Sequence, residues 1–471
     1  MGDPVRQRKS TPPQDLGAQS NELYAARQKI HVRSVTGVFA NWRWALVWIT
    51  QILYYGLPWL TWNGRQAVLF HLTERKFYIF GGVFWPQDVF YLAILLILSA
   101  YALFFFTAIA GRLWCGYACP QTVYTEIFQW IEEKIEGDHT RRRKLERASM
   151  DRRKFVLRSA KYTVWAIFSL WTGFTLVAYF TPLAELLESA RSFRFGPWEL
   201  FWILFYGGFT YLFAGVLREQ VCKYMCPYAR FQSVMFDPDT LVVTYDQERG
   251  EPRGGRKKGV DPRSLGMGDC IDCGICVQVC PTGIDIRKGL QYECIGCAAC
   301  IDGCDQVMDK MGYPRGLIRY STENALKKHW GRREIVAHVL RPRTLIYGGI
   351  LALGCLAMLW SLATRSDLRV DVIRDRAMLA REVQGGLIEN VYQLQIMNMQ
   401  EVTRVLDIRV SGLDGIRLDG AQRVEVLPAS TESVTVQVRV PPESGTPGSH
   451  EIFFDVNVVN DPKVAVREHT T

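Results

Sequence analysis

Five stretches of this chain contain no Asp, Glu, Lys or Arg, and each is about as long as a bilayer is thick. They cover residues 44–63, 89–111, 162–184, 200–217 and 344–364. At about 1.5 Å per residue, roughly 20 helical residues span a hydrocarbon core of about 30 Å. Buried helices of a soluble protein are the alternative, but four of the five windows are rich in Trp, Tyr and Phe. We therefore predict a membrane-spanning bundle of five α-helices.

Basic residues alternate between the loops that join these windows. Residues 1–43 carry 7 Lys and Arg, 112–161 carry 12 and 218–343 carry 20, whereas 65–88 carry 3 and 182–199 carry 2. Because basic loops stay on the cytoplasmic side of a membrane, we expect a cytoplasmic N-terminus and an exported C-terminal region. Topology and contact with anionic membrane lipid explain the basic residues, so no nucleic-acid partner is expected.

The C-terminal region has the pattern of β-structure. Residues 365–471 hold 12 Lys and Arg against 16 Asp and Glu, and they contain no Cys. Apolar residues alternate with polar ones in four segments, one of which has Val434, Val436, Val438 and Val440. Such alternation, separated by turns rich in Gly, Asp and Pro, is typical of a small antiparallel sandwich. A domain of about 100 residues can bury enough core to fold without disulfides.

The strongest chemical signal is a cysteine pattern, C-x2-C-x2-C-x3-C, that occurs twice. It is formed by Cys270, Cys273, Cys276 and Cys280, and again by Cys294, Cys297, Cys300 and Cys304. This is the bacterial ferredoxin spacing, in which the fourth Cys of each run binds the other cluster. Zinc ribbons, which use two CxxC pairs per site, fit less well. We therefore predict two [4Fe–4S] clusters, one on Cys270, Cys273, Cys276 and Cys304, the other on Cys294, Cys297, Cys300 and Cys280.

Two further motifs, both C-x-Y-x-C-P, follow the second and fourth apolar windows. The first contains Cys115 and Cys119, and the second contains Cys222 and Cys226. If the chain stays helical, sulfurs at i and i+4 share a face, and the two motifs could present four thiolates to one site. Soft thiolates suit Cu(I), Zn or iron–sulfur chemistry. Buried structural cysteines or a disulfide are the alternatives, and a cytoplasmic position disfavours a stable disulfide.

This combination of features resembles the CcoG family of cytochrome c oxidase accessory proteins, also called FixG or RdxA, which are membrane-bound polyferredoxins. The resemblance covers nearly the whole chain. Besides the cysteine motifs, it rests on residues 308–326 (MDKMGYPRGLIRYSTENAL) and 385–398 (GGLIENVYQLQIMN). The expected fold is a multi-domain membrane protein: a five-span α-helical transmembrane bundle, a bacterial-type 2[4Fe–4S] ferredoxin insert and a C-terminal all-β Ig-like sandwich.

The chain is expected to lie in a bacterial inner membrane and to divide into five parts. These are a cytoplasmic N-terminal segment (1–43), spans 1–4 with both CxxxCP motifs (44–235), a cytoplasmic ferredoxin-like domain (236–343), span 5 (344–364) and a periplasmic Ig-like domain (365–471).

The resemblance implies a role in maturing cbb3-type cytochrome oxidase, with reduction of Cu(II) to Cu(I) for copper delivery. Electrons from a quinol or a cytoplasmic donor would pass through the two clusters to copper held by Cys115, Cys119, Cys222 and Cys226. The activity would be that of an oxidoreductase, a cupric reductase. The implied partners are copper chaperones or transporters and assembly factors of the oxidase.

Two other functions fit the same sequence. The paired CxxxCP motifs also occur in quinol-oxidising membrane ferredoxins of the NapH and NosR type, which feed a periplasmic reductase but generally lack an exported β domain. The chain could instead be a non-catalytic assembly factor whose clusters sense the redox state.

Overall fold

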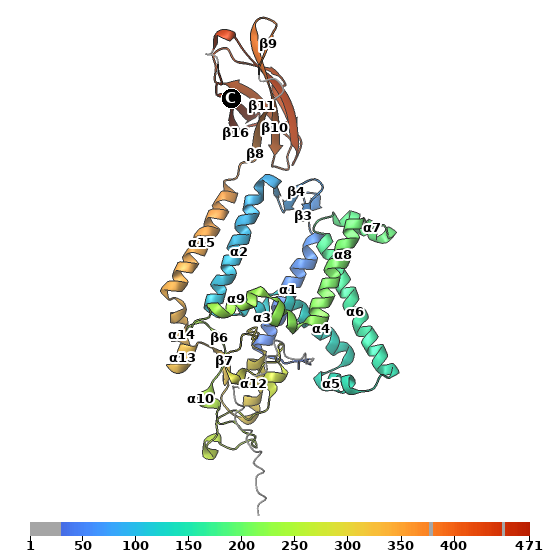
Figure 1. Ribbon diagram of the computed structural model, residues 1–471, viewed down its shortest axis with the longest axis vertical. Helices are drawn as coiled ribbons and strands as arrows, with labels where there is room; N and C mark the ends of the chain where they lie inside the picture. The colour runs from blue at the N-terminus through green and yellow to red at the C-terminus, as the bar shows by residue number, and fades with distance from the viewer. Residues whose placement is uncertain (1–29, 376–379, 445–447) are drawn as a thin grey trace, which may run out of the picture.

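The computed structural model describes residues 30–375, 380–444 and 448–471. Three parts follow one another along the long axis of the molecule (Figure 1): a β-sandwich, a bundle of long helices, and a segment of short helices and loops that carries the ferredoxin runs. Residues 1–29 of the expected N-terminal segment lie outside the described part of the chain.

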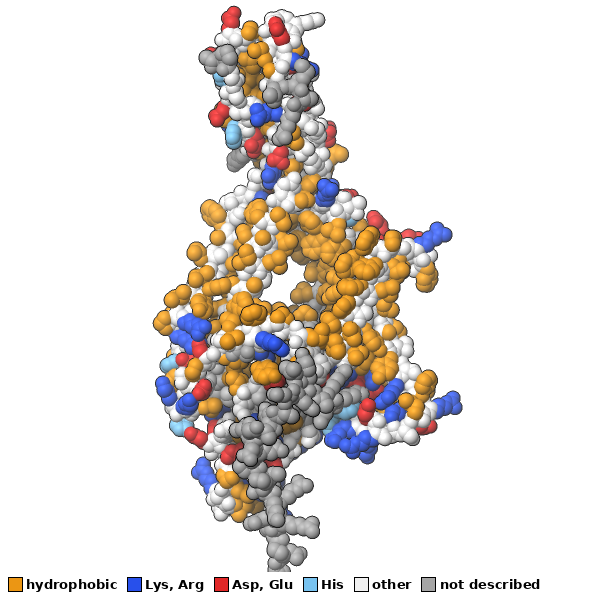
Figure 2. Space-filling view, viewed as in Figure 1, with side chains coloured by type: hydrophobic (Ala, Val, Ile, Leu, Met, Phe, Trp, Pro, Cys, Tyr) orange, Lys and Arg blue, Asp and Glu red, His pale blue; other side chains and the backbone are white. Residues whose placement is uncertain are grey.

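Among the described residues, three helices are long and apolar enough to cross a membrane: Pro86–Ala110, Pro197–Leu217 and Pro342–Ala363. They consist of η2 (Pro86–Asp88) with α2 (Val89–Ala110), α8 (Pro197–Thr210) with the π-helical η3 (Tyr211–Leu217), and α15 (Pro342–Ala363). Each begins with a Pro, whose missing N–H is harmless in a first turn. Figure 2 shows hydrophobic side chains covering this middle region, as a protein surface in contact with lipid requires. The chain is a membrane protein.

By length and hydropathy, the described residues contain three candidate spans rather than the five predicted. Windows 44–63 and 162–184 fall in α1 (Val38–Gly56) and α6 (Arg152–Val177), whose composition is less apolar. The α1 helix contains Arg43 together with Trp and Tyr residues, which contribute little hydropathy. The first ten residues of α6 include five basic side chains, and the uncharged remainder is too short to span a bilayer alone.

The α6 helix packs closely along the span formed by α8. A Cβ on Gly173 would collide with the carbonyl oxygen of Ile203, and one on Gly207 would lie 3.0 Å from the carbonyl oxygen of Ser169. Small residues allow this close helix–helix approach in membranes. The apolar half of α6 therefore lies alongside a membrane-spanning helix.

Shorter helices join the long ones. At the ferredoxin end they are α3 (Leu113–Tyr117), α4 (Pro120–Glu136), α5 (His139–Arg147), η4 (Val221–Met225) and α9 (Pro227–Met235). At the opposite end they are η1 (Leu57–Trp59) and α7 (Leu183–Ser192).

A buried carboxylate ties these helices together at the ferredoxin end. Glu132 on α4 is fully buried and lies 2.8 Å from Arg218, 3.5 Å from Lys161 on α6 and 3.7 Å from Arg142 on α5. Burial by itself would raise the pKa of Glu132, but the three cations outweigh that effect and hold the pKa well below its usual value. The carboxylate is therefore charged, and it pairs at one point with cations from α5, from α6 and from the residue that follows η3.

Between α1 and α2 the chain forms small sheets on which the sandwich rests. Their strands are β1 (Thr61–Trp62), β2 (Arg65–Gln66), β3 (Val68–His71), β4 (Lys76–Ile79) and β5 (Gly82–Phe84). Arg365 donates hydrogen bonds to the Asp88 carboxylate at 2.5 Å and to the Val83 carbonyl at 2.9 Å. Glu401 accepts a hydrogen bond from Arg65 at 2.5 Å. These contacts fix the base of the sandwich to the end of the bundle.

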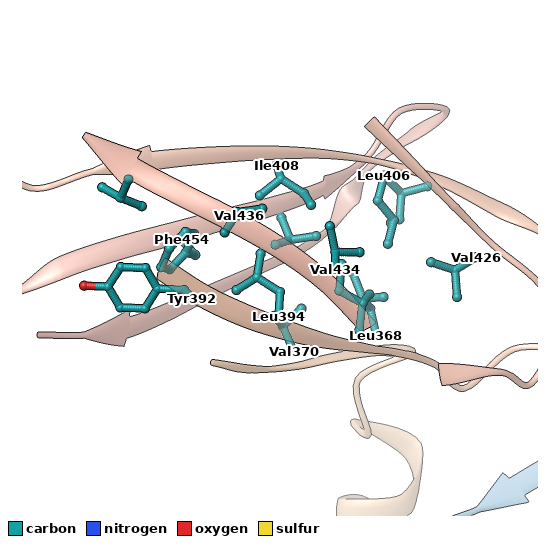
Figure 3. Packing of buried hydrophobic residues seen from close by; sticks show 14 of the residues in the cluster. Leu368, Val370, Tyr392, Leu394, Leu406, Ile408, Val426, Val434, Val436 and Phe454 are labelled. Carbon is teal, nitrogen blue, oxygen red and sulfur yellow. The ribbon is translucent and has the colours of Figure 1, made fainter. Parts of the chain in front are cut away.

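The C-terminal part is an all-antiparallel sandwich, as predicted. One sheet contains β8 (Leu368–Arg374), β9 (Arg381–Val383), β10 (Leu387–Asn398), β12 (Arg417–Gly420) and β14 (Thr431–Val440). The other contains β11 (Arg404–Ser411), β13 (Arg423–Val426), β15 (Ile452–Val458) and β16 (Asp461–Thr470). Tyr392 and Leu394 of β10 pack against Phe454 of β15 in the core between the sheets (Figure 3). Val434, with Val436 two residues later, points into the same core, which is the predicted alternation.

The ferredoxin segment is compact although it has little regular structure. A two-stranded sheet, β6 (Val242–Tyr245) with β7 (Ile318–Ser321), joins its two ends. Its short helices are α10 (Gln247–Gly250), η5 (Pro262–Leu265), α11 (Ile275–Gln278), η6 (Ile286–Lys288), α12 (Ala299–Met311), α13 (Glu323–Lys327) and α14 (Arg332–Val339). The pairing of β6 with β7 holds the cysteine-bearing loops between them.

Glu132→Gln should destabilise the bundle strongly, because it leaves buried cations without their carboxylate. Removing one partner of a buried ion pair costs about 3–5 kcal/mol, so the midpoint of thermal unfolding in detergent should fall. Glu323→Gln is the control, since the exposed Glu323–Lys327 pair contributes about 0.5 kcal/mol or less. Equal midpoints for the two variants would show that the Glu132 cluster does not hold the helices together.

Candidate redox centres

The two CxxxCP motifs have the same local structure. In each, the first Cys lies in a short helical segment, α3 or η4, and the second, Cys119 or Cys226, is the N-cap residue of the next helix. Pro120 and Pro227 occupy the first position of α4 and α9, where Pro begins a helix and cannot continue one. The condition of one continuous helix through the motif is therefore not met, because the backbone is extended at the second Cys.

The four sulfurs of the two motifs nevertheless lie close together, although neither motif forms one continuous helix. Cys115, Cys119, Cys222 and Cys226 all lie within electrostatic range of one another. Burial is the main influence on Cys115 and Cys222 and raises the pKa of each to about 12. The Cys115 thiol donates to Gln232 Oε1 at 3.4 Å. A bound cation would be needed to keep such buried sulfurs as thiolates.

The cysteines of the first predicted ferredoxin cluster surround one small cavity. Cys270, Cys273, Cys276 and Cys304 line it together with apolar side chains, and Cys304 interacts electrostatically with the other three. Burial raises the pKa of Cys276 to about 11 and that of Cys304 to about 12. Cys273 is exposed, so this group reaches the protein surface.

The cysteines of the second predicted cluster form a group with no exposed member. Cys280, Cys294, Cys297 and Cys300 all interact electrostatically with one another. Burial raises the pKa of Cys294 to about 12 and that of Cys300 well above its usual value. Cys300 also interacts with Cys276 of the first group, so the two groups are neighbours.

These arrangements suit clusters better than single ions. A zinc ion at about 2.3 Å from each sulfur draws its ligands to within roughly 4 Å of one another. Cys270, Cys273, Cys276 and Cys304 instead surround a cavity, as the ligands of the larger iron–sulfur cubane do.

The first CxxxCP motif touches the second ferredoxin group through the backbone. A Cβ on Gly116 would lie 2.8 Å from Cys297 Cα and 2.9 Å from its nitrogen, so only glycine fits there. Tyr320 on β7 donates to the Gly296 carbonyl at 2.5 Å and contacts the Tyr117 hydroxyl at 3.5 Å. The four-cysteine site and the second group are thus packed directly together.

A buried arginine lies between these two sites. Arg112 is 4% exposed and donates to the backbone carbonyls of Tyr292 and Ala229. Its guanidinium lies within electrostatic range of Cys115 on one side and Cys294 on the other. A buried cation in this place favours negative charge at both sites.

A carboxylate from the ferredoxin segment holds the start of α1. Asp302 on α12 accepts hydrogen bonds from the backbone N–H of Ala40 at 2.7 Å and of Phe39 at 3.3 Å. A carboxylate at a helix N-terminus satisfies free donors and complements the helix dipole. The ferredoxin segment is therefore anchored to the bundle at α1 as well as at α3.

Known protein families and relatives match nearly all of this chain. Residues 92–144 match a 4Fe-4S binding domain, residues 217–323 a 4Fe-4S dicluster domain, and residues 358–471 the IG-like fold at the C-terminal of FixG. Protein RdxB of Cereibacter sphaeroides is 39% identical over 96% of this chain and 97% of its own length. Nitrogen fixation protein FixG of Rhizobium meliloti is 36% identical over 90% of this chain and 86% of its own. The chain belongs to the FixG/RdxA family.

Family membership establishes the general activity. As a FixG/RdxA protein, the chain is a membrane iron–sulfur electron-transfer protein with an Ig-like C-terminal domain. Protein RdxA of Cereibacter sphaeroides, 36% identical over 93% of this chain and 94% of its own length, agrees with this assignment. The first CxxxCP motif falls inside the 92–144 match and the second inside the 217–323 match.

Three residues that build these sites do not stand out in the sequence. In the sequence, Arg112 is only one of several basic residues in its loop, although it directly follows an apolar window. Gly116 differs from Lys223 at the same place in the second motif, and this asymmetry is the signal that only the first motif meets another backbone. Asp302 lies between two ferredoxin cysteines, and nothing in the sequence links it to α1.

Gly116→Ala should disturb the second ferredoxin group, because its methyl group would overlap the Cys297 backbone. We expect about half of the bound iron to be lost from anaerobically purified protein, with weaker electron paramagnetic resonance signals after reduction. Gly349→Ala on α15 is the control, since a Cβ there meets open space. Full iron content in Gly116→Ala protein would contradict the close packing of the two sites.

Proposed function

We propose that this protein reduces Cu(II) to Cu(I) as a step in copper delivery to cbb3-type cytochrome oxidase. The observation that carries the proposal is that the four CxxxCP cysteines lie together and are packed against the second ferredoxin group. A metal ion and an electron source can therefore meet at one place.

The ferredoxin cysteines are the proposed cluster ligands in the two groups described above. One-electron transfer is the chemistry that two [4Fe–4S] clusters supply when bound. Exposed Cys273 places the first group at the protein surface. Cys300, which lies near Cys276, joins the first group to the second. Arg112 offsets negative charge where the second group meets the CxxxCP site.

Copper enters this scheme as the substrate. Cys115, Cys119, Cys222 and Cys226 offer soft ligands, which favour Cu(I) over Cu(II) and so assist the reduction. Each Cu(II) gains one electron to become Cu(I), and no covalent bond of the protein is formed or broken.

The proposed orientation follows from the spans and the basic residues. Because α15 joins the ferredoxin segment to the sandwich, the two parts lie on opposite sides of the bilayer. Residues 218–343 carry 20 Lys and Arg, which favours the cytoplasm for the ferredoxin end and the periplasm for residues 365–471. The sandwich can then dock copper chaperones or oxidase assembly factors outside, while the copper site lies at the cytoplasmic surface of an inner membrane.

A double variant, Cys115→Ser with Cys119→Ser, tests the copper site. Serine oxygen is a poor ligand for Cu(I), so dithionite-reduced protein should reduce added Cu(II) about tenfold more slowly or not at all, as measured with a Cu(I)-specific chromophore. Cys355→Ser in α15 is the matched control, because Cys355 lies apart from the motifs and should leave the rate unchanged.

The same variants separate the copper proposal from its two rivals. Unchanged Cu(II) reduction in the double variant would rule out the CxxxCP cysteines as the copper site. If Cys270→Ser and Cys273→Ser together left oxidase assembly intact in cells, the protein would be a non-catalytic assembly factor. If copper had no effect on its electron transfer but a periplasmic reductase did, it would resemble the NapH-type ferredoxins in function.

A further inference from the structure

A large cavity lies between α1, α4 and α6, close to the second ferredoxin group. Its volume is about 1040 Å³, at the upper end of the range of about 300–1,000 Å³ that small-molecule sites occupy. Most of its wall is apolar and includes Trp44 and Trp48 of α1, Trp130 of α4, and Phe168 and Trp171 of α6. Aromatic walls of this kind suit a flat, apolar ligand.

The cavity opens toward lipid. Trp48 and Ile167 line it and are 63% and 62% exposed. Ile167 lies on the part of α6 that packs, through Gly173, against the membrane-spanning α8. An exposed apolar rim at the depth of a spanning helix admits a ligand that is dissolved in the bilayer.

A few polar groups interrupt the apolar wall. Buried Arg43 forms an ion pair with Glu126, and both line the cavity. The Oε1 atom of Gln51 is buried and has no hydrogen-bond partner within the described residues. Gln51 can therefore accept a hydrogen bond from a ligand hydroxyl, Arg43 can donate one, and the Glu126 carboxylate can take up a proton.

The wall also contains the backbone that carries the second ferredoxin group. Pro281, next to Cys280, and Ala299, next to Cys300, both line the cavity. A ligand here is therefore separated from that group by little more than the chain that holds it.

The polar groups of the cavity also face the neighbouring sulfurs. Burial raises the pKa of Cys297, and the Arg43 guanidinium opposes this effect, so Arg43 lies between the cavity and the second group. A second, small cavity shares Arg43 and Glu126 with the first and reaches Cys222 of the CxxxCP site. One ion pair thus adjoins the cavity, the second ferredoxin group and the copper site.

We propose that this cavity binds an isoprenoid quinol, the electron donor of the relay. This inference rests on the proposed function, because it names the donor for the same cysteine groups. The balanced reaction is QH2 + 2 Cu(II) → Q + 2 Cu(I) + 2 H+. Both O–H bonds of the quinol break, its ring is oxidised by two electrons that leave singly toward the Cys280 group, and the protons leave in turn through the Glu126 carboxylate.

The test uses the purified full chain in lipid nanodiscs and the short-chain probe decylubiquinol. Ile167→Trp narrows the mouth of the cavity without adding a buried side chain, and Gln51→Leu removes the free acceptor. Ile97→Trp on α2 is the matched control, because Ile97 is equally exposed, at 66%, and lies on a different helix away from the cavity. Binding is followed by quenching of Trp fluorescence with decylubiquinone, and electron transfer by bleaching of the iron–sulfur absorbance with decylubiquinol.

In the wild type and in Ile97→Trp we expect both quenching by decylubiquinone and bleaching by decylubiquinol. In Ile167→Trp and in Gln51→Leu we expect binding and electron transfer to fall about tenfold. Dithionite should fully reduce every variant. Equal rates in Ile167→Trp and Ile97→Trp, or a phospholipid in the cavity that decylubiquinone does not displace, would overturn the quinol site.

If dithionite-reduced protein reduces Cu(II) but quinol gives no bleaching, only the donor is wrong. If quinol bleaches the protein but no Cu(II) is reduced, the quinol site stands and the proposed copper function fails.

Discussion

The backbone contact between Gly116 and Cys297 is the feature on which the rest of this structure depends. It places a turn that begins at the end of a membrane-spanning helix directly on a ferredoxin loop. Arg112 reinforces the contact by donating to carbonyls on both sides of it. Because of this contact, the ferredoxin segment is a part of the bundle, and its second cysteine group lies beside four further cysteines.

The surrounding helices serve to hold that contact in place. The α4 helix begins at Cys119 and carries Glu132 near its other end, where three buried cations fix it to α5, α6 and the segment after η3. Asp302 caps α1 from the ferredoxin side. The sandwich is attached at the far end of the bundle through Arg365, away from the cysteine sites.

Much of this architecture is predictable because it depends on local periodicity. The alternating valines of β14, the apolar windows of α2, α8 and α15, and the ferredoxin spacing are local patterns. Only three of the five predicted spans have the hydropathy of a membrane span among the described residues, because uncharged length is not the same as hydropathy: α1 and α6 contain Trp, Tyr and basic residues that neighbouring helices accommodate. Neither CxxxCP motif forms one continuous helix, because a Pro at the first helical position ends one segment and starts another. Long-range contacts such as Asp302 with α1 leave no trace in sequence spacing.

The central claim is that two neighbouring iron–sulfur groups deliver electrons to the membrane surface. Metal and sulfide analysis of the anaerobically purified full chain, with electron paramagnetic resonance after dithionite reduction, tests it most directly. The account predicts iron and sulfide for two [4Fe–4S] clusters, and a spectrum broadened by the interaction of two neighbouring spins. Zinc in place of iron, or a spectrum of one isolated cluster, would contradict it.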